Sequence, residues 1–176
     1  DIGSGKSIKR DIGTAYLIYG QDKLDAEKPA AQKIIINTPG VAATMPGLSA
    51  YDHFGYSVAG VGDLNNDGKA DFVIGAPRVD SPNGSTKRWD SGAIFVYLGK
   101  SGHHSSYQPT HRIDGTYNGH LFGYQVAPAG DIDGDQKADL LVSSYFGSSS
   151  GAGEVSLFWG HSLGPNKNPQ RQQISK

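Results

Sequence analysis

Two short acidic stretches of the sequence have the residue types and spacing of metal-binding loops. Seven of the fifteen aspartates fall within residues 63–71 and 131–139, and both stretches follow the pattern D-x-[DN]-x-D-x-x-x-D. Side chains at alternate positions of a tight turn converge on one point, and Ca²⁺ prefers six to eight oxygen ligands. Carboxylates gathered without a cation would repel one another by ~1 kcal/mol or more for each close pair. The two stretches therefore predict two calcium sites.

The predicted ligands occupy the same positions in both stretches, and the ninth-position aspartate is expected to be bidentate. They are Asp63, Asn65, Asp67 and Asp71 with the backbone carbonyl of Lys69, and Asp131, Asp133, Asp135 and Asp139 with the carbonyl of Lys137. The alternative is a pair of acidic turns whose aspartates only accept hydrogen bonds from their own backbone. The second stretch has Gln136 where the first has Gly68. A left-handed conformation at Gln136 would cost about 1 kcal/mol, which leaves Gly134 as the residue that could shift the turn instead.

The acidic stretches belong to an internal repeat. The run FGYSVAG at 54–60 returns as FGYQVAP at 122–128, and the stretch 63–71 returns at 131–139, so both pairs are 68 residues apart. A third motif, a β-rich run that begins and ends with glycine, occurs at residues 13–20, 92–99 and 153–160. Self-similarity at a fixed period is typical of repeat architectures.

Each complete unit contains four short runs of strand-forming residues, bounded by Gly, Pro or Asp. The expected strands are 55–60, 71–75, 93–98 and 111–114 in the first unit, 123–127, 139–144, 154–159 and 172–175 in the second, and 14–19 and 33–37 before them. Four-stranded units repeated in this way are typical of β-propeller blades. The predicted fold is therefore all-β, with about two and a half propeller blades of four antiparallel strands.

The predicted organisation is the C-terminal half of a blade and a connecting loop in residues 1–53, followed by complete blades in 54–121 and 122–176. Closed propellers have about four to eight blades. The remaining blades are therefore expected from the rest of a parent chain or from further copies of this one.

The composition excludes several classes of protein. The chain has no cysteine, which rules out disulfide scaffolds, thiolate metal sites and cysteine nucleophiles. A net charge of −1 gives no basic surface for nucleic acid, and the apolar runs are too short to span a membrane. No paired glutamates and no nucleophile–His–acid arrangement indicate catalysis, so the chain is expected not to be an enzyme.

Together these motifs resemble the FG-GAP repeats of integrin α-subunit β-propellers and their bacterial relatives. The pair Phe54-Gly55 opens the first unit and the run Gly-Ala-Pro at 75–77 closes its second strand, whereas the second unit keeps Phe122-Gly123 but has Ser-Ser-Tyr at 143–145. The resemblance implies a seven-bladed propeller with structural calcium in the loop between the first two strands of a blade. It also implies an extracellular or cell-surface location and a role in adhesion or ligand recognition. Animal integrin propellers usually carry disulfides, so the lack of cysteine favours a microbial relative or a different protein that uses the same repeat.

The loops on the propeller face opposite the calcium loops are long and carry residue types that are enriched in binding patches. The predicted ligand-binding residues are Arg78, Arg88, Trp89, Tyr117, His120 and Tyr145. The ligand is expected to be an extracellular protein or a glycan, and for a glycan the aromatic side chains would be sugar platforms. Two alternative functions stay open, a carbohydrate-binding propeller and an accessory propeller of an extracellular enzyme. A further alternative is that these loops are simply exposed and variable.

Overall fold

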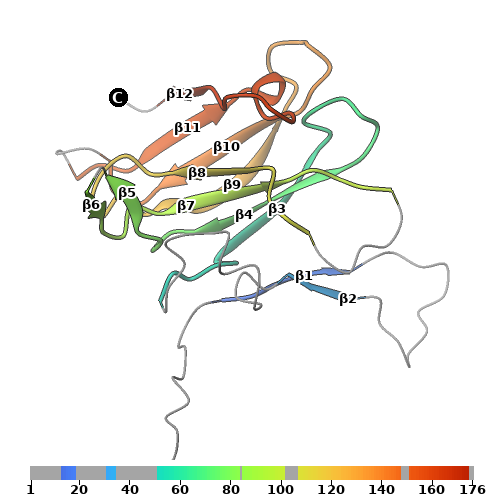
Figure 1. The fold of residues 1–176 in the computed structure, drawn as a ribbon. Helices are drawn as coiled ribbons and strands as arrows, with labels where there is room; N and C mark the ends of the chain where they lie inside the picture. The colour runs from blue at the N-terminus through green and yellow to red at the C-terminus, as the bar shows by residue number, and fades with distance from the viewer. Residues whose placement is uncertain are drawn as a thin grey trace, which may run out of the picture.

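The protein is built of short antiparallel strands, with one three-residue 3-10 helix among the described residues (Figure 1). The structure, a computed structural model, describes residues 13–18, 31–34, 51–83, 85–101, 107–147 and 151–174. The predicted all-β class and the four-stranded antiparallel sheets are confirmed. The described strands form parts of a β-propeller that does not close into a ring. Within this part of the chain, no helix is long and apolar enough to cross a membrane.

The first complete sheet has the strand order β3-β4-β7-β8, with antiparallel neighbours throughout. Its strands are β3 (Ser57–Gly62), β4 (Asp71–Ala76), β7 (Ala93–Tyr97) and β8 (His111–Asp114). The connection from β4 to β7 contains a hairpin that the sequence reasoning missed, formed by β5 (Ser81–Asn83) and β6 (Thr86–Arg88). The Asn-Gly pair at 83–84 is a strong hairpin-turn signal and could have predicted it.

The second complete sheet repeats this arrangement in the order β9-β10-β11-β12. Its strands are β9 (Phe122–Gly130), β10 (Asp139–Ser144), β11 (Glu154–Phe158) and β12 (Arg171–Gln173), and the 3-10 helix η1 (Gly160–Ser162) follows β11. The expected strands 111–114 and 139–144 agree with the observed bounds of β8 and β10. The first strand of each blade runs beyond its expected end to a glycine with positive φ, Gly62 or Gly130, next to a shift in pairing register.

The N-terminal strands β1 (Ala15–Ile18) and β2 (Ala31–Ile34) form a two-stranded antiparallel sheet. An isolated bridge joins Gly13, just before β1, to Phe54, and the same bridge joins Gly92, just before β7, to Phe122. This equivalence agrees with the prediction that β1 and β2 are the third and fourth strands of a preceding blade, which stays a prediction. Residues 35–37, the end of the strand expected at 33–37, lie outside the described residues.

The blades pack face to face through alternate side chains of their strands (Figure 1). In β4, Val73 packs with Val126 and Val142 of the second blade, whereas the neighbouring Ile74 packs with Phe54 on the side of β1. Successive residues of a strand face opposite sides of its sheet, so a sheet covered on both faces needs apolar residues at nearly every position. This accounts for the almost fully buried sequences of β4 and β7.

At Gly75 the backbones of the two complete blades approach each other closely. A Cβ atom there would lie 2.2 Å from the carbonyl oxygen of Gly123, which also accepts a 2.8 Å hydrogen bond from the Ser57 hydroxyl. The opening Phe-Gly of the second blade therefore docks against a position of the first blade that has no side chain.

We predict that Gly75→Ala lowers the free energy of unfolding by about 1–3 kcal/mol, because the added methyl group must push β4 of the first blade away from β9 of the second. Urea unfolding followed by far-UV circular dichroism measures this. The matched control is Gly60→Ala, on the exposed part of β3 with nothing within 4 Å of the added atom, and its effect should stay within about 0.5 kcal/mol. Equal losses in the two variants would contradict the close packing at Gly75.

Candidate metal centres in two aspartate loops

Each acidic stretch connects the first two strands of its blade and folds around the carboxylate of its first aspartate. In the β3–β4 loop, Asp63 accepts hydrogen bonds from the N–H groups of Asp67 at 3.0 Å and Gly68 at 2.7 Å. In the β9–β10 loop, Asp131 accepts the N–H groups at the equivalent positions at 3.0 and 2.9 Å. The aspartates thus accept hydrogen bonds from their own backbone, as the alternative interpretation expected. The carboxylates still have other lone pairs that could bind a cation.

The ninth aspartate of each loop ties the loop to the residues that follow the third strand of its own sheet. One carboxylate oxygen of Asp71 accepts the N–H of Leu64 at 2.8 Å, and the other accepts the N–H of Gly99 beyond β7 at 2.7 Å. Asp139 makes the same two contacts, at 2.8 and 2.9 Å, to Ile132 and to Gly160 beyond β11. Both carboxylates are buried.

The two loops have the same backbone conformation, although their glycines stand at different positions. The fourth and sixth residues have positive φ in both, 58° and 81° at Asn66 and Gly68, and 78° and 67° at Gly134 and Gln136. The expectation that Gly134 shifts the second turn is therefore wrong. Gln136 adopts the left-handed conformation itself, at a cost of about 1 kcal/mol, and the hydrogen bonds to Asp131 hold it there.

The loop geometry alters the proton affinities of its carboxylates. Desolvation raises the pKa of Asp63, but hydrogen bonds from the loop's N–H groups outweigh it and hold the pKa below its ordinary value. Burial raises the pKa of Asp71. The hydrogen bonds that Asp71 accepts lower this pKa, whereas the negative charges of Asp63 and Asp67 raise it, and the net result is a pKa above the ordinary value. In the second loop, desolvation raises the pKa of Asp135, but contacts with Lys137 and His161 bring it below its ordinary value.

The second loop brings its candidate ligands together. Carboxylate oxygens of Asp131, Asp133 and Asp139 lie within 4.8 Å of one another. Around the first loop, no three acidic or histidine side chains of the described residues come as close, and its third position is Asn65. A set of carboxylate, amide and carbonyl oxygens is the donor chemistry that Ca²⁺ prefers, so the residues present fit this ion.

Comparison with known proteins now identifies the repeat. A family model described as FG-GAP repeat matches residues 54–97 and 122–158, which contain the first three strands of each complete blade. The chain is an FG-GAP repeat protein. The FG-GAP repeats account for the opening Phe-Gly pair and the aspartate loop of both blades.

The curated relatives of this FG-GAP protein include integrin α-subunits. It is 35% identical to human integrin alpha-IIb over 119 residues, which are 68% of this chain and 11% of that protein. It is 37% identical to mouse integrin alpha-7 over 118 residues, 67% of this chain and 9% of that protein. With integrin alpha-PS2 of Drosophila melanogaster the identity is 29% over 142 residues, 79% of this chain and 10% of that protein. The chain thus spans about a tenth of the length of these relatives.

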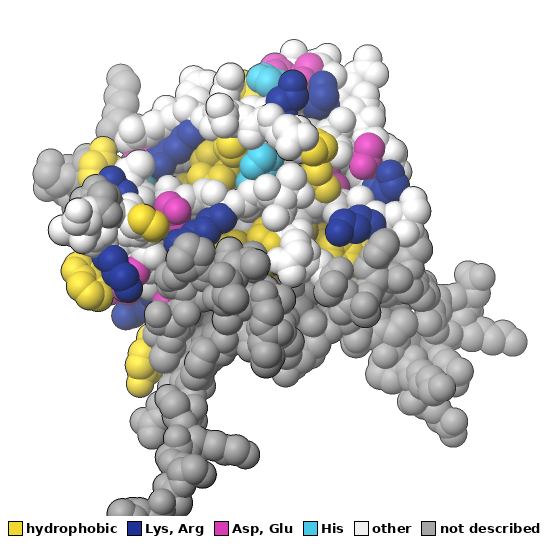
Figure 2. All heavy atoms as spheres, viewed as in Figure 1, with side chains coloured by type: hydrophobic (Ala, Val, Ile, Leu, Met, Phe, Trp, Pro, Cys, Tyr) yellow, Lys and Arg dark blue, Asp and Glu magenta, His cyan; other side chains and the backbone are white. Residues whose placement is uncertain are grey.

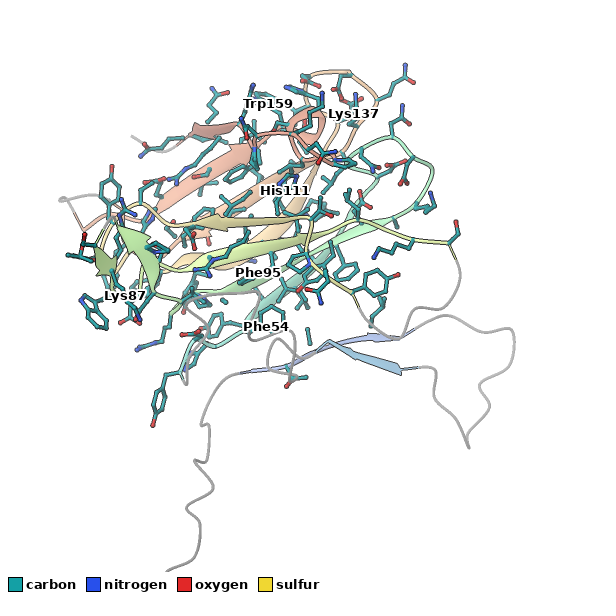
Figure 3. The ribbon with its side chains drawn as sticks, in the orientation of Figure 1. Phe54, Lys87, Phe95, His111, Lys137 and Trp159 are labelled. Carbon is teal, nitrogen blue, oxygen red and sulfur yellow. The ribbon has the colours of Figure 1, made fainter. Side chains whose placement is uncertain are left out.

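At the other end of the FG-GAP blades, three connections are joined by hydrogen bonds. Trp89 of the β6–β7 connection accepts the N–H of Gly119 at 2.8 Å, and His120 accepts the N–H of Phe146 from the β10–β11 connection at 3.4 Å. Figure 3 shows Lys87 beside this face and Lys137 of the second aspartate loop at the opposite end of the sheets. The loops with the predicted ligand-binding residues therefore form one face, away from the aspartate loops.

The predicted ligand-binding residues divide into exposed and buried ones. Trp89, Tyr117 and Tyr145 are 64%, 48% and 53% exposed, and Arg78 is exposed as well. Arg88 is half-buried and donates a hydrogen bond to the Pro82 carbonyl oxygen at 2.8 Å. His120 is fully buried and cannot contact a ligand in this structure. For the exposed residues, ligand binding stays a prediction.

His120 belongs instead to a buried polar cluster that sequence reasoning did not detect. Its Nδ1 accepts the N–H of Thr116 at 3.3 Å, and its Nε2 lies 3.4 Å from a carboxylate oxygen of Glu154, without the geometry of a hydrogen bond. Glu154 also forms an ion pair with Arg171, whose guanidinium lies over the Phe122 ring. The cluster connects the β8–β9 loop to the outer strands of the second blade.

A row of aromatic rings across the two blades was also missed. Tyr56 and Tyr124 follow the Phe-Gly pairs at equivalent positions, and their ring centroids are 5.0 Å apart. The row continues from Tyr124 to Tyr145 at 5.2 Å and on to Phe146 at 4.7 Å. The repeated FGY motif was the signal that could have predicted it.

We predict that Asp139→Ala destabilises the protein even when a chelator has removed all metal. The substitution leaves the N–H groups of Ile132 and Gly160 without their acceptor, which costs about 1–3 kcal/mol for a buried donor. Asp133→Ala is the matched control, because Asp133 is exposed and accepts a single backbone N–H. Urea unfolding in chelator should separate the two variants, and equal effects would contradict a metal-independent role for Asp139.

We also predict that the free energy of unfolding falls as the pH decreases from about 7.5 to about 5. Burial lowers the pKa of His120. The charge of Glu154 raises this pKa and the charge of Arg171 lowers it, and the net effect is a pKa below the ordinary value. The unfolded state takes up a proton near the ordinary His pKa of about 6.5, before the folded state does. The free energy of unfolding therefore has its full value above about pH 6.5 and decreases as the pH falls below it. An NMR titration in which the His120 ring protonates at or above the ordinary pKa would contradict the prediction.

Proposed function

We propose that this chain is a calcium-binding β-propeller segment of an extracellular, integrin-like protein of adhesion or ligand recognition, in which calcium is structural. The observation that carries the proposal is the pair of aspartate loops with one backbone conformation in two FG-GAP blades. Asp63, Asn65, Asp67 and Asp71 would hold one ion and Asp131, Asp133, Asp135 and Asp139 the other, with the carbonyls of Lys69 and Lys137.

A bound calcium would neutralise carboxylates that otherwise repel one another. Burial raises the pKa of Asp71, and the negative charges of Asp63 and Asp67 raise it further, so carboxylates of the first loop repel one another. Lys69 Nζ lies 3.4 Å from Asp67 and Lys137 Nζ lies 3.2 Å from Asp135, so each loop already has one positive charge beside its carboxylates. A cation bound only by the folded state adds stability by mass action. The first hairpin of each blade would then be fixed at its turn.

Recognition would take place on the face opposite the aspartate loops. Its support is the exposure of Trp89, Tyr117 and Tyr145, since large aromatic side chains supply most of the binding energy at many interfaces. The rest of the propeller would come from a parent chain or from further copies. The extracellular or cell-surface location and the non-enzymatic role are supported by the similarity to integrin α-subunits.

A carbohydrate-binding propeller is the second candidate, because of the aromatic row from Tyr56 to Phe146 beside that face. Half-exposed rings offer flat apolar surfaces with a polar edge. Binding on a glycan array that disappears in Trp89→Ala or Tyr117→Ala would favour this candidate over a protein ligand.

Thermal melting with calcium and with a chelator tests the calcium proposal. At a free calcium concentration of about one hundred times Kd, each site should contribute about 2.7 kcal/mol, and the midpoint should rise by several degrees. The Asp67→Ala/Asp135→Ala variant should lose this response. Lys69→Ala/Lys137→Ala is the control, because it removes only the ammonium groups beside the same carboxylates and should keep the response. If calcium did not raise the melting midpoint of the wild-type protein, the calcium proposal would fail, and the aspartates would serve only to shape the turns.

A further inference from the structure

His161 lies beside the second aspartate loop, although it is distant from that loop in the sequence. It is the second residue of η1, directly after Gly160, whose N–H donates to Asp139 and fixes the start of η1 against the loop. Its Nδ1 lies 3.6 Å from a carboxylate oxygen of Asp133 and 3.5 Å from one of Asp135. Figure 2 shows acidic, basic and histidine side chains gathered at this end of the molecule, and Figure 3 places Trp159 and Lys137 there.

These three ligand atoms have the spacing of a metal site with nitrogen and oxygen donors. All three lie within 4.8 Å of one another. In a tetrahedral site with bonds of about 2.1 Å, neighbouring ligand atoms are about 3.4 Å apart. The two measured distances from Nδ1 agree with that value.

The first loop provides an internal comparison in which this nitrogen is missing. Gly99 donates to Asp71 as Gly160 donates to Asp139, so Lys100 is the counterpart of His161. The ammonium group of Lys100 lies over the Tyr107 ring at 5.3 Å, and a lysine ammonium has no lone pair for a metal. The first loop also has Asn65 where the second has Asp133.

We propose that the second loop is a mixed site, in which His161 joins Asp133 and Asp135 to bind a transition-metal dication of the Zn²⁺ type. Imidazole suits zinc and its neighbours in the first transition row, whereas all-oxygen sites suit calcium and magnesium. The inference rests on the proposed function, because it treats the second loop as a metal loop. A cation held there would also join the turn of the first hairpin to the end of β11.

The mixed site shares Asp133 with the all-oxygen group of Asp131, Asp133 and Asp139. Zinc therefore competes with calcium in the second loop and leaves the first loop to calcium. The opposing assignment is that His161 acts only as a cation beside two carboxylates, in the same way as Lys137 beside Asp135.

Calorimetric titration with Zn²⁺, with and without saturating Ca²⁺, tests the inference. All variants carry His103→Ala/His104→Ala, so that this adjacent pair cannot bind the probe. His161→Lys copies the residue of the first loop, and its Zn²⁺ affinity should fall by about tenfold or more. In the NMR spectrum, Zn²⁺ should shift the ring signals of His161 more than Ca²⁺ does, because Ca²⁺ would bind the neighbouring carboxylates without bonding to the ring.

Equal Zn²⁺ affinities in the His161→Lys variant and its parent would overturn the inference. If calcium still binds both loops in that case, the proposed function stands and His161 is only a neighbouring charge. If zinc binding depends on His161 but neither loop takes calcium, the mixed site is supported and the calcium function fails.

Discussion

The carboxylate of the ninth aspartate holds each FG-GAP blade together. Asp71 accepts an N–H from the start of its own loop with one oxygen and an N–H from beyond the third strand with the other. A buried carboxylate is tolerated only when such donors compensate for its lost hydration. The hydrogen bonds of this carboxylate therefore hold the aspartate loop, the first hairpin and the end of the third strand in fixed positions relative to one another. A cation would enter a loop whose backbone is already ordered, which reduces the entropy lost on binding.

The two blades are held to each other in the core and at both ends. In the core, apolar side chains of the facing sheets pack around Val73 and Val126. The Ser57 hydroxyl donates a hydrogen bond to the carbonyl oxygen of Gly123 in the opening Phe-Gly pair of the second blade. At one end, the carbonyl of Asp63 accepts the N–H of Ala138, so that one aspartate loop touches the next at 3.0 Å. At the other end, Ser91 accepts the N–H of Phe122, the first residue of β9, at 3.0 Å. The aspartate loops and the aromatic face are thus at opposite ends of the strands.

Much of the fold could be predicted because its signals are local and repeated. Strands such as 139–144 combine strand-forming residues with clear boundaries, and the 68-residue period fixes their equivalence. The aspartate loops could be located for the same reason. The partners of a residue depend on tertiary contacts instead. His161 reaches the second loop only because η1 turns back against it, and His120 is buried only because three connections close over it. Gln136 adopts a left-handed conformation against its local preference because Asp131 binds its N–H.

The close approach at Gly75 also has a consequence for the order of the repeats. The equivalent position in the second blade is Ser143, which pairs with Gln125 and Val155 as Gly75 pairs with Ser57 and Ile94. Ser143 carries a side chain where Gly75 admits the backbone of the following blade. The two blades are therefore not interchangeable modules. Each face is shaped for one neighbour, so duplicating or permuting the units would change the spacing between blades even though every strand and loop was kept.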